Sequence, residues 1–258
     1  MTNRIKCKFD ELKQKGDKAL IGYLTAGDPD MKTSERNIRT ALRNGVDILE
    51  IGVPFSDPTA DGPTIQEAGQ RALASGITLR KILSMAKNLR RSFSTPMVLF
   101  SYANPIFSYG YEKLCADAAS AGIDAMLLVD MPFEESGEIR SSMRSHGLQF
   151  IPLIAPTTPR ARAEAILSEA EGFVYYILVK GVTGTRENLP SEARAHLKEL
   201  RRCTALPIAV GFGISNGKQA RLAAEYADAV VVGSALIKAA MAGKLAALVR
   251  ELAKAVHQ

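Results

Sequence analysis

Short apolar runs alternate with amphipathic stretches along the chain, and this alternation predicts strands and helices in turn. Near the C-terminus, apolar residues recur at helical spacing and predict a helix with one buried face. That face carries Leu245, Leu248, Val249, Leu252 and Val256. Eight apolar runs predict buried strands: Leu20–Leu24, Val46–Ile51, Met97–Phe100, Ala125–Val129, Gln149–Ile154, Phe173–Val179, Pro207–Val210 and Ala229–Val232.

Glycines mark the points at which predicted helices end. Gly45, Gly122 and Gly147 each stand between a helical pattern and the next apolar run. Glycine accepts the left-handed backbone that often ends a helix. Repeated strand–helix–glycine units predict parallel βα units, and eight of them predict an α/β fold: a single (β/α)8 TIM barrel with extra helices, over residues 1–258. A doubly wound open sheet is the alternative, but no Gly-x-Gly-x-x-Gly opens the first unit.

Two connections are longer than one helix requires. The second strand is followed by the loop Pro54–Pro63 and by a predicted extra helix over Thr64–Ala74. The sixth strand is followed by the polar segment Lys180–Pro190. In a barrel, such loops lie at the C-terminal ends of the strands, where active sites form. We expect both loops to move over the substrate.

A carboxylate interrupts the second predicted strand. Strand alternation places Glu50 on the face of Ile48 and opposite Leu49 and Ile51. Two large aliphatic side chains suit the side that meets the helices, so Glu50 is predicted to point into the barrel near its C-terminal end. Burial there should raise its pKa.

A second carboxylate, Asp61, follows in the Pro54–Pro63 loop, which can fold over the barrel mouth. Two carboxylates in different environments can divide acid and base roles. The alternative is an ion-paired Glu50 and an Asp61 that only shapes a turn, because structural ion pairs also perturb carboxylates.

Glycine-rich segments follow the last three predicted strands: Gly181-Val182-Thr183-Gly184, Gly211-Phe212-Gly213 and Gly233-Ser234-Ala235. Glycine lets backbone N–H groups approach an anion, and a helix N-terminus favours negative charge. Barrels commonly bind phosphate after strands seven and eight. The segments together predict a phosphate site, although each alone is equally a turn.

Composition narrows the class of protein. Of 258 residues, 47% are hydrophobic and 23% are charged, which is ordinary for a globular chain. No apolar run is long enough to cross a membrane, and the first residues lack the apolar core of a signal peptide. Cys7, Cys115 and Cys203 are odd in number and far apart. They predict reduced thiols in a cytoplasmic protein, without metal-site spacing.

The net charge of +6 raises the question of nucleic-acid binding. The basic residues are interleaved with acids, and Arg90-Arg91 and Arg201-Arg202 fall on polar positions of predicted helices. Solvated helix faces explain them better, and the excess charge modestly favours an anionic substrate. The three histidines, His146, His196 and His257, are predicted to be surface residues without an acid–base role.

A family resemblance rests on one long motif, Glu50-Ile51-Gly52-Val53-Pro54-Phe55-Ser56-Asp57-Pro58, which continues through Ala60-Asp61-Gly62-Pro63-Thr64-Ile65-Gln66. With its supporting motifs, the chain resembles the tryptophan synthase alpha chain family over nearly its whole length. The supporting motifs are Leu24-Thr25-Ala26-Gly27-Asp28-Pro29, Tyr102-Ala103-Asn104-Pro105, Asp130-Met131-Pro132, Gly181-Val182-Thr183-Gly184 and Gly211-Phe212-Gly213-Ile214.

The resemblance implies a lyase of tryptophan biosynthesis that cleaves indole-3-glycerol phosphate to indole and glyceraldehyde 3-phosphate. It implies no cofactor or metal in this chain. It also implies a beta-chain partner that holds pyridoxal phosphate, an alpha2beta2 heterotetramer, and passage of indole between the subunits through a tunnel.

The resemblance also implies roles for individual residues. Glu50 would protonate indole C3 and take the side-chain hydroxyl proton, and ionised Asp61 would accept the indole N–H. Tyr175 would lie beside the glycerol, with Thr183 also at the substrate. The remaining implied residues are Tyr23, Phe100, Leu127, Leu153 and Phe212 for the indole pocket, Gly184, Gly213, Gly233, Ser234 and Ala235 for the phosphate, and Asp57 and Pro58 for the beta chain.

Some residues admit a second interpretation. Tyr102 and Asn104 are equally explained as turn-shaping residues, and Asp130 as a cap of the next turn. Thr59 stands where the family usually has an aliphatic residue, and Val179-Lys180 lies in a region that varies in the family. Thr59 keeps open a regulatory subunit that activates the beta chain without its own lyase activity. Lys180 could instead form a Schiff base, although it should face away from Tyr175 on a regular strand.

Overall fold

The computed structural model describes residues 3–177, 191–211 and 213–257 of the chain. Within these residues, one sheet of nine strands lies at the centre of the molecule, and every pairing in it is parallel. The strands are β1 (Ala19–Thr25), β2 (Ile48–Gly52), β3 (Met97–Ser101), β4 (Ala125–Leu128), β5 (Gln149–Phe150), β6 (Leu153–Ile154), β7 (Val174–Ile177), β8 (Ile208–Gly211) and β9 (Ala229–Val232).

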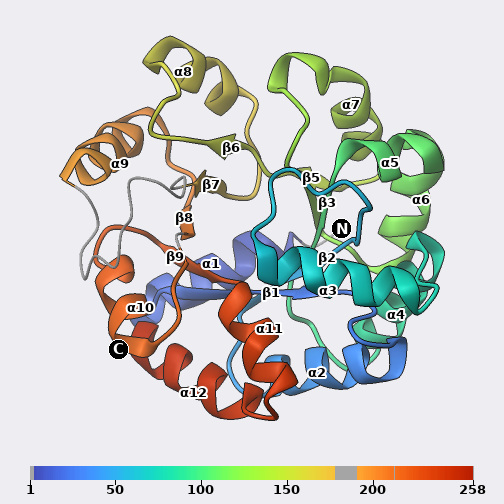
Figure 1. Cartoon of the computed structure of the whole chain (residues 1–258). Coiled ribbons are helices and arrows are strands. Elements are labelled where there is room, and N and C mark those ends of the chain that lie inside the picture. The colour runs from blue at the N-terminus through green and yellow to red at the C-terminus, as the bar shows by residue number, and fades with distance from the viewer. Residues whose placement is uncertain (1–2, 178–190, 212, 258) are drawn as a thin grey trace.

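Helices surround this sheet (Figure 1). Those in the described part of the chain are α1 (Arg4–Lys15), α2 (Met31–Arg43), α3 (Pro63–Ala74), α4 (Leu79–Arg90), α5 (Ala103–Tyr109), α6 (Tyr111–Ala121), the short 3-10 helix η1 (Phe133–Glu135), α7 (Gly137–Ser145), α8 (Arg160–Ser168), α9 (Ser191–Cys203), α10 (Gly217–Ala224), α11 (Ser234–Met241) and α12 (Leu245–Val256). None of these helices is long and apolar enough to cross a membrane.

The strand order β5-β4-β3-β2-β1-β9-β8-β7-β6 closes the sheet into a barrel. Its two ends, β5 and β6, belong to one predicted strand, Gln149–Ile154, which pairs first with β4 and then with β7. The break falls at Ile151-Pro152, because proline has no N–H to donate to a ladder. The Ile151 N–H still donates to the Met126 carbonyl (2.9 Å), and the Pro152 carbonyl accepts from Tyr175 (2.9 Å). The predicted (β/α)8 barrel is confirmed.

Strand alternation sorts the side chains into an interior and an outer layer. Ile48 belongs to a buried cluster inside the barrel, whereas Leu49 and Ile51 pack in the layer between sheet and helices. The N-terminal end of the barrel is plugged by α1, which precedes the first predicted strand and is not among the predicted elements. Its Phe9 lies 5.9 Å from Phe173, measured between ring centroids.

Aspartates join neighbouring strands at the N-terminal end of the barrel. Asp47, Asp124 and Asp228 stand just before β2, β4 and β9, and the backbone N–H of each donates to a carbonyl at the start of a neighbouring strand. Each carboxylate in turn accepts the backbone N–H of the same strand residue. The donors are Leu20 for Asp47 (2.9 Å), Met97 for Asp124 (2.8 Å) and Ile208 for Asp228 (2.9 Å).

A basic side chain also pairs with each of these aspartates. His257 lies 2.8 Å from Asp47, Arg201 pairs with Asp228, and Arg4 and Arg90 each lie 2.8 Å from Asp124. The predicted solvated face is therefore wrong for Arg90. Its guanidinium also donates to the carbonyl oxygens of residues 93, 95 and 122, so it is largely buried.

Other predicted elements agree with the structure. Gly45, Gly122 and Gly147 all have positive φ, at 120°, 82° and 70°. The extra helix over Thr64–Ala74 is α3, which begins one residue earlier at Pro63, a favoured first helical residue. The predicted apolar face of the last helix is buried in α12, with Leu248 partly exposed.

Candidate active site

Glu50 is fully buried in the middle of β2, at 0% exposure. Its register partners are Tyr23 on β1 and Val98 on β3, and Val98 belongs to the interior cluster. Among the described residues, neither carboxylate oxygen of Glu50 has a hydrogen-bond partner. Burial therefore raises its pKa to about 8. The interior position predicted for Glu50 is confirmed, and the ion-paired alternative has no support in the described chain.

Asp61 lies in the loop between β2 and α3, where it is half-buried. Burial raises the pKa of its carboxyl group to about 6, and a hydrogen bond from Tyr102 acts in the opposite direction. At pH 7 Asp61 is therefore mainly ionised and Glu50 mainly protonated. Environments that separate two carboxylates in this way are typical of acid–base pairs.

Tyr23 lies close enough to both carboxylates for their charges to act on it. Its phenol is buried, and its pKa is raised by that burial, by the charge of Asp61 and by the charge of Glu50. The ring packs edge-on against Phe100, with 5.1 Å between centroids. A methyl group on Gly52 would overlap with this phenol. Gly52, the last residue of β2, therefore leaves the space that Tyr23 occupies.

Three further residues of the predicted indole pocket, and Tyr175 of the predicted glycerol site, meet in the barrel interior. Phe100, Leu127, Leu153 and Tyr175 all belong to or pack against the interior cluster. Burial raises the pKa of Tyr175 well above its usual value, and the charge of Glu50 adds to this. A methyl group on Gly211 would lie only 3.0 Å from the Tyr175 hydroxyl. The structure brings these side chains to one end of the barrel, around Glu50.

The predicted phosphate residues fall partly within the described chain. Ser234 and Ala235 open α11, and the residue before them, Gly233, has no side chain that could cap the first N–H groups. Gly233 lies against the Tyr23 ring, and a methyl group there would be 3.4 Å from it. Gly213 has a φ of 75° and is exposed. Thr183, Gly184 and Phe212 lie outside the described residues, as does Lys180.

The residues predicted to face a partner lie on the surface of the β2–α3 loop. Asp57 is exposed and accepts a hydrogen bond from Ser56 (2.6 Å), and Pro58 is half-buried. Thr59 is exposed as well, and its N–H donates to the Asp57 carbonyl (3.0 Å). The Thr59 hydroxyl therefore does not enter the packed part of the loop.

Histidines do not contribute to this end of the barrel. All three are half-buried rather than fully exposed, because each has a structural partner. His257 binds Asp47, His146 lies 3.4 Å from Glu112, and His196 meets the Tyr176 hydroxyl at 3.0 Å. Within the described ranges, no three His, Cys, Asp or Glu side chains form a group that could hold a metal.

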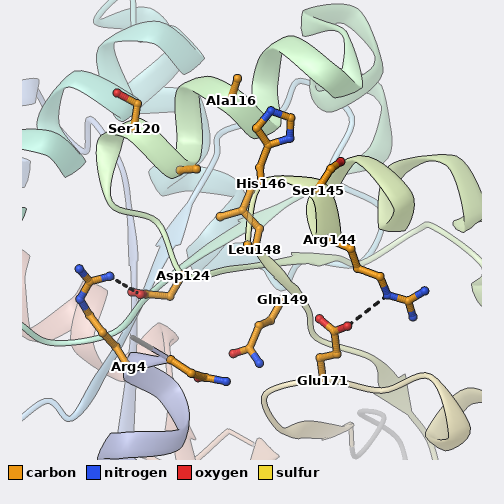
Figure 2. Close-up of a pocket in the computed structure, with 13 residues that line it drawn as sticks. Arg4, Ala116, Ser120, Asp124, Arg144, Ser145, His146, Leu148, Gln149 and Glu171 are labelled. Carbon is orange, nitrogen blue, oxygen red and sulfur yellow. Dashed lines mark hydrogen bonds and ion pairs between the residues drawn. The ribbon is translucent and has the colours of Figure 1, made fainter. Parts of the chain in front are cut away.

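A large open pocket of about 760 Å³ lies at the opposite end of the barrel (Figure 2). Its charged side chains already have partners within the protein: Arg4 binds Asp124 (2.8 Å), and Arg144 binds Glu171 (3.2 Å). Parallel barrels place chemistry at the C-terminal ends of their strands. This pocket, beside the start of β4 and β5, is therefore not the candidate active site.

Comparisons with known proteins decide the family. The family model described as "Tryptophan synthase alpha chain" matches residues 9–257. The chain belongs to the tryptophan synthase alpha chain family. It is 48% identical to the tryptophan synthase alpha chain of Geobacter sp. (strain M21), over 92% of this chain and 88% of that protein. It is 46% identical to that of Geobacter sulfurreducens, over 97% and 95%.

Solved structures agree with this family. The alpha subunit of tryptophan synthase from Legionella pneumophila has a TM-score of 0.91 and 37% identity, and the match covers 99% of both chains. A chain of Mycobacterium tuberculosis tryptophan synthase has a TM-score of 0.93 and 34% identity over the whole of both chains. Members of the tryptophan synthase alpha chain family thus share both the sequence and the barrel of this chain.

Sequence reasoning missed the roles of four residues. Gly52 and Gly211 end β2 and β8 and provide space for Tyr23 and Tyr175. The only sequence signal was a glycine at a strand end. Tyr102 was one of two possible turn-shaping residues, yet its hydroxyl accepts the Ala60 N–H at 2.9 Å. Asp130 caps the start of α5 through the Ala103 N–H (2.7 Å), rather than the turn that follows it.

Proposed function

We propose that this chain cleaves indole-3-glycerol phosphate to indole and glyceraldehyde 3-phosphate by carboxylate acid–base catalysis. The observation that carries the proposal is Glu50, a fully buried carboxylic acid with a raised pKa at the active end of an alpha-chain barrel. A general acid is most effective when its pKa lies near the working pH. Family membership supplies the reaction, and the two carboxylates supply the groups to perform it.

Cleavage of the carbon–carbon bond requires two proton transfers. The protonated Glu50 carboxyl donates its proton to indole C3, and positive charge develops on the ring nitrogen. Ionised Asp61 accepts the ring N–H and stabilises that charge. The bond between C3 and the side chain then breaks, its electron pair returns to the ring, and the adjacent hydroxyl gives its proton to Glu50. Indole and an aldehyde result, and Glu50 is protonated again.

The remaining residues bind the substrate in this proposal. Tyr23, Phe100, Leu127, Leu153 and Phe212 line the indole pocket, Tyr175 lies beside the glycerol, and Thr183 also binds the substrate. Gly184, Gly213, Gly233, Ser234 and Ala235 hold the phosphate. The uncapped start of α11 supports this, because its first N–H groups are available to an anion. It lies beside Tyr23, so one extended substrate can reach both.

The product indole passes to a beta chain in the same proposal. This chain supplies no cofactor, and the beta chain holds pyridoxal phosphate in an alpha2beta2 heterotetramer in the cytoplasm. Asp57 and Pro58 face that partner. Their position on the surface of the loop that also carries Asp61 supports a coupling between partner binding and the active site.

The test is indole release from indole-3-glycerol phosphate by the purified chain, with and without a matched beta chain. We expect release from the chain alone, and faster release when the partner is added. Glu50→Gln should bind the beta chain normally and lose nearly all cleavage. Glu67→Gln is the matched control, because Glu67 is exposed on α3. No release by a folded chain in its complex would favour the regulatory-subunit alternative.

A further inference from the structure

One side chain holds both ends of the loop that carries Asp61. Tyr102 follows β3, precedes α5 and is only 2% exposed. Its ring packs against Phe55 at the start of the loop, with 5.1 Å between ring centroids. Its hydroxyl accepts the Ala60 N–H at 2.9 Å near the end of the loop. Both ends of the loop thus contact the same buried side chain.

The Tyr102 hydroxyl therefore lies beside the residue that follows Ala60, and a hydrogen bond from it lowers the pKa of the Asp61 carboxyl group. A phenol can accept one N–H and donate its own proton at the same time. With the Ala60 N–H as donor to its oxygen, Tyr102 directs its O–H toward the carboxylate of Asp61. An O–H donor stabilises the ionised carboxylate, which is the form that accepts an indole N–H.

The backbone around Tyr102 is itself fixed. Its carbonyl accepts the Ser101 hydroxyl at 3.0 Å, and Ser101 is fully buried. The next residue, Ala103, donates its N–H to Asp130 (2.7 Å), which fastens the start of α5 to the β4 end of the barrel. The backbone of Tyr102 is therefore held at the ends of β3 and β4, and not by the loop that its hydroxyl contacts.

We propose that Tyr102 is a positioning residue that holds Asp61 in place and ionised for the indole N–H. This inference rests on the proposed function and adds a residue to it. Tyr102 acts through Asp61 and makes no bond in the reaction. A second contact holds the loop from α3, because the Gln66 carboxamide donates to the Asp61 carbonyl at 2.9 Å. That bond fixes the backbone of Asp61 but not its carboxylate.

The test is Tyr102→Phe, which keeps the ring against Phe55 and removes only the hydroxyl. A hydrogen bond to a charged group typically contributes enough for about a tenfold loss of kcat/KM. The acid limb of kcat/KM, which Asp61 sets near pH 6, should move to higher pH. Tyr109→Phe is the matched control, since the Tyr109 hydroxyl binds Asp117 (2.7 Å) on α6. It should leave the limb in place.

The effect of Tyr102 on Asp61 must be separated from the effects of other titratable groups nearby. Tyr23 on β1 is coupled to Asp61, and Glu50 on β2 acts on the same Tyr23. Tyr102→Phe in an Asp61→Asn background separates them, because a residue that acts only through Asp61 should cause little further loss there. An unchanged pH limb, or a full additional loss in the Asp61→Asn background, would overturn the inference. Absence of cleavage by the unaltered chain would instead overturn the proposed function.

Discussion

The two ends of the barrel treat buried carboxylates in opposite ways. At the N-terminal end, the buried Asp47 and Asp124 and the partly exposed Asp228 each accept a backbone N–H and pair with a basic side chain. At the C-terminal end, Glu50 is more deeply buried, and no described group binds either of its oxygens. A satisfied carboxylate joins strands, whereas an unsatisfied one costs stability and keeps a proton near neutral pH. Carboxylates thus join strands at one end of the barrel, and at the other end Glu50 is buried without a partner in the described chain.

The largest expected difference between the ends is in catalysis. Glu50→Gln keeps the size of the side chain but cannot exchange a proton, so kcat for indole release should fall on the order of 10³-fold. The measurement is steady-state indole release at pH 7 by the beta-chain complex, because the variant should still assemble. A variant that keeps more than about a tenth of the activity would remove Glu50 from the proton transfers.

The same residue should reduce stability as the pH rises. The pKa of Glu50 is about 8 in the folded chain and near its ordinary value of 4.5 when unfolded. The contribution of the protonated Glu50 side chain to the free energy of unfolding is therefore fully present below pH 4.5, and it is lost as the pH rises to about 8. Between pH 4.5 and pH 7 the loss is about 3 kcal/mol. Since Glu50→Gln does not titrate, the variant should gain that much over the unaltered chain.

Urea unfolding of the two proteins at pH 5, 6, 7 and 8 measures this gap. Glu67→Gln should follow the unaltered chain at every pH, because that side chain is exposed. A gap that stays constant with pH would mean that Glu50 is already ionised in the folded chain. Its proposed role as an acid would then have no physical basis.

Asp124→Ala tests the opposite end. The substitution leaves the Met97 N–H and the largely buried Arg90 guanidinium without their carboxylate. We expect a loss of about 2 kcal/mol in the free energy of unfolding, with kcat per folded molecule unchanged. Asp10→Ala is the control, because Asp10 pairs with Lys6 on the exposed side of α1 and should have little effect. Loss of activity without loss of stability would contradict the assignment of Asp124 to stability alone.

The sequence predicted regular features better than single contacts. Apolar runs and glycines locate eight strand positions, and alternation places Glu50 inside the barrel, because both signals are local and periodic. The break of the fifth strand was visible in principle at Pro152. The plug formed by α1 was not, since Ile5, Phe9 and Leu12 look the same on a surface helix. Its partners lie far along the chain.

Roles that depend on one distant contact were the hardest to predict. Arg90 looked like one of many surface arginines, and only its bonds to Asp124 and to residues 93, 95 and 122 show that it is buried. Tyr102 looked like a turn residue, because its partners Phe55, Ala60 and Asp61 lie some forty residues earlier. No pattern along the sequence encodes such a pairing. It depends on which loops the barrel brings together.

The smallest expected effect concerns His257, which gives the N-terminal end a weak pH dependence of its own. A hydrogen bond with Asp47 raises the pKa of His257 above its ordinary value of 6.5. Its contribution is therefore fully present below pH 6.5 and is lost as the pH rises through the higher folded value. The His257 side chain is 29% exposed to solvent, so the effect should stay below about 1 kcal/mol. The free energy of unfolding of His257→Gln should be lower than that of the unaltered chain at pH 5.5, and the difference should be much smaller at pH 8.5. The pH dependence of Glu50 has the same sign but is common to both proteins, so the comparison isolates the histidine. An equal loss at both pH values would mean that His257 acts by packing alone.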